Sequence, residues 1–191
     1  MAIALVIAAH PDDNFLGSGC TRRKLTRQGW KIVELILWGG RGTAYDNAQD
    51  QFPLIETVKR IEEKLAEVSP ERVYTHSASD LNVDHNICHK AVLAATRPMP
   101  KCCVKEIYCF ETASSTEWNF TGNQFRPNVF EEITEEDLKY KLDMLEKLYA
   151  SEMRNFPHPR SPKYLRACAE RWGGVIGVPL AEAFELVRLI R

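Results

Sequence analysis

The stretch IALVIAAHPDDN, residues 3 to 14, decides the architecture of this chain. It begins as an uninterrupted apolar run and then changes abruptly to His10, Pro11, Asp12 and Asp13. A continuous apolar run is typical of a strand buried on both faces of a parallel sheet. Because packing gives such a strand no reason to end in an imidazole and two carboxylates, we expect these side chains to carry chemistry.

Apolar strands and amphipathic helices alternate after this stretch. The patterns predict strands at 31–38, 72–76 and 104–111, and helices at 16–28, 54–68 (with Pro53 at its first position) and 84–98. Such alternation favours an α/β fold with a mostly parallel sheet and right-handed crossovers. The fold class is therefore a Rossmann-like three-layer sandwich, and residues 1–191 are predicted to form a single domain.

The pattern loosens after residue 112. It predicts, in order, a polar loop at 113–128, a short strand at 129–133, a helix at 134–153 opened by a capping box, a proline-rich turn, and a helix to about Arg171. The segment 181–190 fits a helix or a strand equally well.

Composition narrows the classes of function. The chain has 191 residues and a formal net charge of −1, which gives no general attraction to nucleic acid or to anionic membranes. No apolar run reaches the roughly 20 residues of a membrane span. The N-terminal apolar run leads directly into the charged motif instead of a cleavage site, and the six cysteines form no CxxC pair. We expect a cytoplasmic protein without a membrane span or a nucleic-acid partner.

A second polar cluster, SDLNVDHNICH at residues 79 to 89, follows the predicted strand 72–76. Ligands of open α/β sheets bind at the carboxyl ends of the strands, so the two clusters are expected to meet there. Two histidines and a carboxylate form a ligand set for catalytic zinc, and a further carboxylate can act as general base. Either cluster alone also fits a helix cap, but their shared position favours a site.

Both clusters resemble the motifs of a known family. AAHPDDNFLGSGC, residues 8 to 20, resembles the AHPDDExLGxGG signature of the PIG-L/LmbE-like zinc-dependent N-deacetylases. SDLNVDHNICHKAVLAATRP, residues 79 to 98, is similar to the second motif of that family. The segments SSTEW, PNVF, FPHPRS and EAFELVR resemble its bacterial branch, so the resemblance extends over nearly the whole chain.

The resemblance implies a role for each motif residue. His10, Asp13 and His85 would bind Zn²⁺, and Asp12 would act as general base. Asn82 stands where many members carry a histidine; an amide can donate a hydrogen bond to an oxyanion but cannot act as an acid. Protonated Asp12 would then supply the proton of the leaving amine. The implied supporting or substrate-binding residues are Asp84, Arg41, Asp46, Asn47, His158 and Arg160.

The chain departs from the family pattern at two places. Position 14 is Asn where the family usually has Glu. After LWGGRG, residues 37 to 42, the helix and strand that the family generally inserts are missing. The sheet is therefore expected to have one edge strand fewer, which would expose the strand at 31–38 as an apolar edge. Because such an edge needs a cover, we expect a homo-oligomer.

Three functions follow as hypotheses. The first is a zinc hydrolase that removes an N-acetyl group from a small N-acylated amino sugar or glycoconjugate, with a zinc-bound water as nucleophile. The second is a degenerate member that binds a glycoconjugate without turnover. The third is a nucleotide-binding Rossmann-like domain, but GSGC and WGGRG are glycine turns that do not make the GxGxxG fingerprint.

Overall fold

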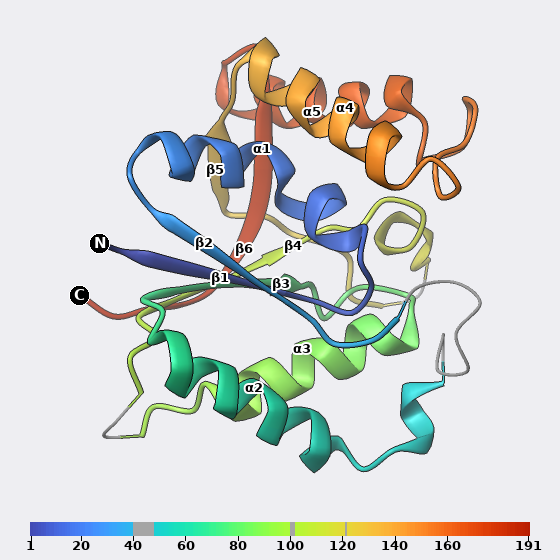
Figure 1. Ribbon diagram of the computed structural model, residues 1–191. Coiled ribbons are helices and arrows are strands. Elements are labelled where there is room, and N and C mark those ends of the chain that lie inside the picture. The colour runs from blue at the N-terminus through green and yellow to red at the C-terminus, as the bar shows by residue number, and fades with distance from the viewer. Residues whose placement is uncertain (40–47, 100–101, 121) are drawn as a thin grey trace.

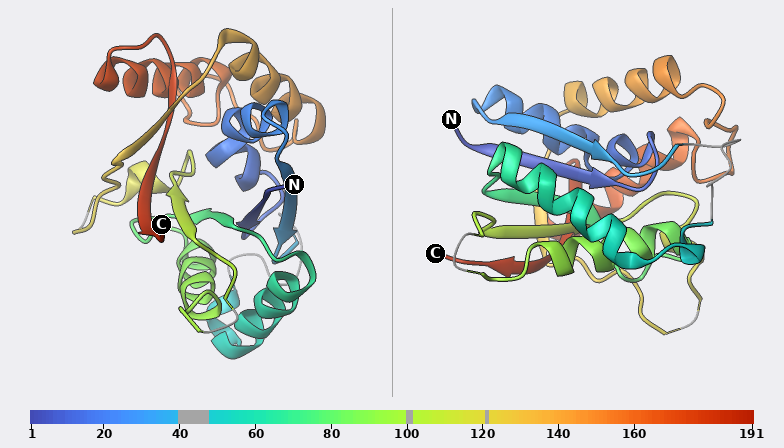
Figure 2. Two further views of the ribbon diagram at one scale, coloured as in Figure 1. Left: turned by 90° about the vertical axis from the view of Figure 1, so that its left-hand side faces the viewer. Right: turned by 60° about the horizontal axis from the view of Figure 1, so that its bottom comes forward.

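The structure of this chain is a computed structural model that describes residues 1–39, 48–99, 102–120 and 122–191. Its described part forms three layers (Figure 1). A six-stranded sheet lies in the middle, with helices α1, α4 and α5 on one face and helices α2 and α3 on the other. Figure 2 shows the same layers from two further directions. The predicted three-layer α/β sandwich is confirmed.

The elements have the following bounds: β1 Ile3–Ala8, α1 Asp13–Arg27, β2 Lys31–Ile36, η1 Gln49–Gln51, α2 Leu54–Val68, β3 Arg72–His76, α3 Val83–Ala95, β4 Glu106–Phe110, η2 Thr116–Trp118, β5 Val129–Glu132, α4 Glu135–Leu148, α5 Pro162–Ile176 and β6 Ala181–Leu189. The ambiguous segment 181–190 is thus a strand. Several predicted bounds shift: α1 begins at Asp13, three residues early, Pro53 precedes α2 as its N-cap, β4 begins at Glu106 instead of residue 104, and α4 ends at Leu148 instead of residue 153.

The strand order is β2-β1-β3-β4-β6-β5. Strands β2, β1, β3 and β4 run parallel, and β6 runs antiparallel to both β4 and β5. The sheet is therefore mostly parallel, as predicted. Since β1 pairs with β3, the polar segments that follow these two strands leave the sheet next to each other.

Strand β1 is buried on both faces. Leu5 and Ile7 belong to the core beneath α2 and α3, whereas Ala4 and Val6 belong to the core on the opposite face. All four side chains are completely buried. This explains why the strand is a continuous apolar run, because alternation is seen only when one face meets water.

Strand β2 forms one edge of the sheet, as predicted. Its Leu35 side chain is buried, and Lys31 and Glu34 are exposed. Arg60 of α2 donates hydrogen bonds to the carbonyls of Ile36, the last residue of the strand, and Leu37, which follows it. The expectation of a partner chain along this edge stays a prediction.

None of the described helices combines the length and the apolar character that crossing a membrane requires.

Candidate metal centre

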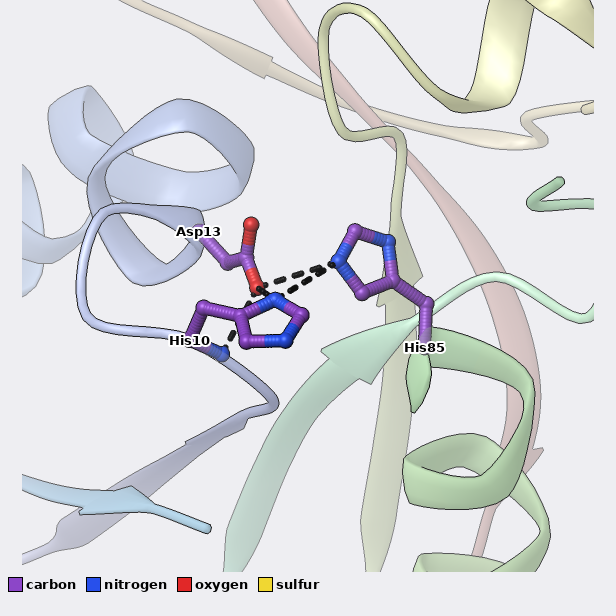
Figure 3. Close-up of side chains that lie close together, drawn as sticks. All are labelled: His10, Asp13 and His85. Carbon is purple, nitrogen blue, oxygen red and sulfur yellow. Dashed lines mark hydrogen bonds and ion pairs between the residues drawn. The ribbon is translucent and has the colours of Figure 1, made fainter. Parts of the chain in front are cut away.

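Two connections at the carboxyl edge of the sheet bring three side chains together (Figure 3). His10 lies in the turn after β1, Asp13 opens α1, and His85 lies in the first turn of α3 after β3. Asn82 caps α3 by accepting hydrogen bonds from the backbone N–H groups of Asp84 and His85. This cap fixes the start of the helix, and with it the position of His85.

The three side chains have the spacing of a metal ligand set. Asp13 Oδ2 lies 3.2 Å from His10 Nδ1 and 3.2 Å from His85 Nε2, and the two nitrogens are 3.3 Å apart. Tetrahedral zinc with bonds of about 2.0–2.1 Å separates neighbouring ligands by roughly 3.3–3.4 Å. Asp13 Oδ1 is also buried without a hydrogen-bond partner among the described residues. The donor set therefore fits zinc with one coordination position left open.

Charge reinforces this fit. Burial by itself would raise the pKa of the completely buried Asp13, but the charge of His85 and the hydrogen bonds from both histidines hold that pKa well below its usual range. Burial opposes protonation of His85, yet Asp13 and Asp80 raise its pKa to about 10. Without a metal, the ionised Asp13 is thus balanced by protonated imidazole. A divalent cation would replace those protons, since metal ligands must be deprotonated.

Each histidine meets an aspartate on its other ring nitrogen. His10 Nε2 lies 3.1 Å from Asp84 Oδ2, and His85 Nδ1 lies 3.0 Å from Asp80 Oδ1. A carboxylate behind a ligating histidine orients the ring and makes it a better ligand. The resemblance implies that Asp84 supports a histidine or the strand-end backbone, and in the structure it contacts His10. Asp80 belongs to the predicted second polar cluster, but the sequence assigns it no role in the site.

His76 does not qualify as a ligand, although it forms a second cluster with Asp80 and His85. Its Nε2 accepts a hydrogen bond from the backbone N–H of Ala9 at 3.0 Å, which occupies the lone pair. Burial, and then the charge of His85, lower the pKa of His76 to about 3, so the ring is neutral. It stacks on His85 at 3.9 Å between ring centroids. His76 therefore supports His85 by packing.

Asp12 lies beside the cluster at the N-cap of α1, and it is almost completely buried. Its Oδ2 is 2.8 Å from Arg160 Nη1, which also lies 3.1 Å from Glu152 Oε2. Burial and the neighbouring Asp13 raise the pKa of Asp12 to about 6, and the Arg160 charge limits that rise. A carboxylate with such a pKa is suited to take up and release protons near neutral pH.

The remaining predicted residues fall at different places. His158 Nδ1 accepts a hydrogen bond from the backbone N–H of Arg160, and the His158 ring meets Trp118 edge-on at 5.9 Å. His89, which lies in the second polar cluster without a role implied by the resemblance, contacts the carbonyl oxygen of His76. Asn14, where the family has Glu, donates a hydrogen bond to Glu34. The predicted Arg41, Asp46 and Asn47 lie outside the described residues.

Fold and site together define a three-layer α/β protein with a His–Asp–His cluster at the carboxyl edge of its sheet. Solved structures with this fold include deacetylases. The zinc-inhibited form of teicoplanin deacetylase Orf2 aligns with a TM-score of 0.76 and 14% identity over 98% of both chains. N,N'-diacetylchitobiose deacetylase from Pyrococcus horikoshii aligns with a TM-score of 0.62 and 16% identity over 97% of this chain and 84% of that chain.

The comparison of sequences also finds a protein that is a deacetylase by name. An uncharacterized deacetylase, YaiS of Escherichia coli strain K12, is 27% identical over 174 residues, which cover 75% of this chain and 88% of that protein. No family model matches the chain. The resemblance to the PIG-L/LmbE-like deacetylases is confirmed, and the chain has their fold.

The fold alone does not determine the reaction. The 4-carboxy-2-hydroxymuconate hydratase GalB from Pseudomonas putida KT2440 aligns with a TM-score of 0.71 and 21% identity over 100% of this chain and 99% of that chain. A hydratase and deacetylases thus share this architecture, so a function for this chain has to come from its site residues.

Proposed function

We propose that this protein is a zinc-dependent deacetylase that hydrolyses the N-acetyl group of a sugar-containing substrate. The observation that carries the proposal is the His10–Asp13–His85 cluster, whose donor atoms lie 3.2–3.3 Å apart, with the buried carboxylate of Asp12 next to it. The deacetylases among the similar proteins support the reaction class.

His10, Asp13 and His85 would hold the zinc ion. When bound, zinc supplies a Lewis acid that polarises an amide carbonyl and lowers the pKa of a water molecule. Residues of the chain carry out the proton transfers. Asp12 accepts a proton from the attacking water as its oxygen adds to the carbonyl carbon. As the C–N bond breaks, Asp12 returns the proton to the departing nitrogen, so the products are acetate and a free amine.

Two further residues assist in this scheme. Arg160 bridges Asp12 and Glu152, which keeps the Asp12 carboxylate in one place. The Asn82 amide is oriented by its role as helix cap, because its Oδ1 accepts two backbone hydrogen bonds. We propose that the Nδ2 group of Asn82 donates to the developing oxyanion, in place of the histidine of many relatives.

The substrate is proposed to be a small N-acylated amino sugar or glycoconjugate. Trp118 in η2 is 40% exposed and lies edge-on to His158, which belongs to the same loop as Arg160. An exposed aromatic ring beside the loop that carries Arg160 provides a flat apolar surface on which a sugar ring can stack. The Orf2 and Pyrococcus horikoshii enzymes are deacetylases of teicoplanin and diacetylchitobiose by name, which favours a sugar-containing substrate.

Acetate release is the direct test. Zinc-loaded protein is incubated with N-acetylglucosamine, diacetylchitobiose and an N-acylated glycoconjugate, and acetate and free amine are both quantified. Asp12→Asn is expected to lower kcat by about 10²–10⁴-fold, the usual contribution of a general base. Asp143→Asn is the matched control, because this exposed aspartate pairs with Lys139 on the surface of α4, away from the cluster.

The outcomes separate the alternatives. Equal acetate release by the Asp12→Asn variant and the wild type would contradict the proposal. Zinc-dependent sugar binding without acetate release would instead favour a protein that binds glycoconjugates without turnover. Addition of water to a conjugated C=C bond, with no acetate formed, would place the chain beside its hydratase neighbour in function.

A further inference from the structure

We propose that Asp80 is a positioning residue of the metal centre, which sets the tautomer and the orientation of His85. The inference rests on the proposed zinc site and adds to it a residue outside the expected ligand set. On the side away from His85, the Asp80 carboxylate contacts Ser115 and Thr116, which lie in the loop after β4. The loop that carries Trp118 is therefore connected to a metal ligand through one carboxylate.

Asp80 is 3% exposed and has four neighbours that can donate to it. Its Oδ1 lies 3.0 Å from His85 Nδ1 and accepts hydrogen bonds from the backbone N–H of Asn82 at 2.8 Å and from the Ser115 hydroxyl. Its Oδ2 accepts from Thr116 Oγ1 at 2.7 Å. Three of these contacts fall on Oδ1 and one on Oδ2, and an ionised carboxylate has no donor of its own.

The contact between Asp80 and His85 indicates which ring nitrogen of His85 carries the proton. His85 Nδ1 and Asp80 Oδ1 are in ion-pair contact at 3.0 Å, although Nδ1 has no aligned hydrogen-bond acceptor among the described residues. An ionised carboxylate has no proton to donate, and an unprotonated Nδ1 would turn its lone pair toward that negative charge, so we infer that Nδ1 carries the proton. In a neutral imidazole the lone pair then lies on Nε2. This is the atom 3.2 Å from Asp13 Oδ2 and 3.3 Å from His10 Nδ1. Asp80 thereby directs the ligand lone pair of His85 into the metal site.

The loop after β4 holds the other side of the His85 ring as well. The backbone N–H of Thr112 donates to Thr116 Oγ1 at 2.7 Å, and Thr112 Oγ1 lies 3.1 Å from His76 Nδ1. His76 in turn stacks on the His85 ring. Residues 112–116 thus contact both groups that hold His85, the Asp80 carboxylate and the neutral His76 ring. Contacts of a substrate with this loop would reach the metal ligand through short, buried hydrogen bonds.

Zinc affinity measures this role independently of catalysis. Metal-free protein competes with a chromogenic chelator for zinc alone, and Asp80→Asn is compared with the wild type. The variant loses the negative charge that faces His85 Nδ1, and its amide keeps only one accepting oxygen, so we expect zinc affinity to fall by about 10–100-fold. Asp137→Asn is the matched control, because it neutralises a buried aspartate that contacts Thr134 and Arg27 instead of the cluster.

A second variant removes the support and leaves the carboxylate in place. Ser115→Ala/Thr116→Val deletes the two hydroxyl donors to Asp80 and is expected to weaken zinc binding in the same direction, by several-fold. The ¹⁵N chemical shifts of the His85 ring give a signature that general destabilisation would not produce. In the zinc-loaded wild type, Nδ1 is expected to be protonated and Nε2 to be shifted by the metal, and Asp80→Asn is expected to disturb that pattern.

Unchanged zinc affinity and an unchanged His85 tautomer in folded Asp80→Asn would overturn the inference. If Asp80→Asn does not fold, unchanged zinc affinity in Ser115→Ala/Thr116→Val would overturn it. Wild-type protein that binds no zinc would overturn both this inference and the proposed function. Tight zinc binding without acetate release from any substrate would contradict the proposed function alone, and weaker binding by Asp80→Asn would then still support the positioning role.

Discussion

Lys141 of α4 and Glu182 of β6 form a buried ion pair, 2.8 Å long, inside the hydrogen-bond ladder of α1. In a regular helix the Cys20 N–H would donate to the Leu16 carbonyl. Here Lys141 Nζ donates to the Leu16 carbonyl at 2.8 Å, and Glu182 accepts from the N–H groups of Cys20 and Thr21. Ser18, between them, leaves helical geometry. Insertion of side chains into the ladder is an established cause of helix kinks.

Removing one partner of this pair is expected to destabilise the protein strongly. Lys141→Met leaves the Glu182 charge buried without a counter-charge, which costs about 3–5 kcal/mol of unfolding free energy. Urea denaturation of the variant and the wild type measures the change. The double variant Lys141→Met/Glu182→Gln removes both charges and is expected to recover part of the loss. A loss below about 1 kcal/mol in the single variant would be inconsistent with the buried pair.

Two glycines provide a packing test with an internal control. A Cβ at Gly17 of α1 would clash with Cδ2 of the buried Phe110 ring, whereas a Cβ at Gly174 of α5 would meet no atom of the described residues within 4 Å. Gly17→Ala is expected to cost about 1–3 kcal/mol through overpacking. Gly174→Ala is expected to be neutral or to stabilise by up to about 1 kcal/mol, since Ala favours helix. Equal thermal midpoints for the two variants would argue against this packing of α1 on β4.

Glu111, which lies just after β4, is expected to make the stability of the folded protein depend on pH. Burial, and then the neighbouring Glu117, raise the pKa of this carboxyl, although its Oε1 accepts a hydrogen bond from the Trp172 indole. A raised carboxyl pKa stabilises the folded state at low pH, and that advantage is lost as pH increases through the raised value. Glu111→Gln keeps an acceptor for Trp172. Its thermal midpoint relative to the wild type should therefore be higher at pH 8 than at about pH 4, and a pH-independent difference would refute this.

Zinc is expected to stabilise the metal-free protein. Binding to the folded state alone adds about 2.7 kcal/mol at a free concentration 100 times Kd, which a thermal melt detects as a higher midpoint. His85→Ala should abolish the increase because it removes one of the three proposed ligands. Magnesium should not replace zinc, since it prefers oxygen ligands in octahedral geometry. A zinc response that persists in His85→Ala would place the metal elsewhere.

Arg160 is expected to affect turnover because it holds Asp12. Arg160→Met removes the 2.8 Å contact to Asp12 and should lower kcat/KM by about 10²-fold, the scale of a misplaced catalytic group. Arg154→Met is the control on the same loop, since Arg154 donates to the backbone carbonyls of Ser151 and Met153. Steady-state kinetics of acetate release compares the two variants. Equal losses in both would assign the effect to the loop instead of to the Asp12 contact.

Much of this fold could be predicted because each element has its own local pattern. The apolar run of β1 and the capping box of Thr134 and Asp137 at α4 both appear in the structure where the sequence indicates. Segment 181–190 was ambiguous because its apolar spacing fits two periods. It becomes β6 because it pairs with both β4 and β5, and local periodicity carries no information on such pairing.

The site also contains residues that the sequence predicts and residues whose role depends on tertiary contacts. His10, Asp12 and Asp13 directly follow a strand, and His85 opens a helix after the neighbouring strand, so motif and topology predicted that they would meet. Asp80 lies in the same segment as His85, but its importance depends on Ser115 and Thr116, about 35 residues away. No spacing rule in the sequence connects those positions.

By itself, therefore, the sequence indicated the three layers, the mostly parallel sheet and the meeting of the two polar clusters, because periodicity and strand-end position act locally; the choice of His10, Asp13 and His85 as ligands came from the family resemblance. Only the tertiary structure decided the kink in α1, the support behind His85 and the hold of Arg160 on Asp12. Each of these depends on buried charges and hydrogen bonds between segments far apart in the chain. In a buried environment such groups have to satisfy one another, and the fold alone decides which partners are within reach.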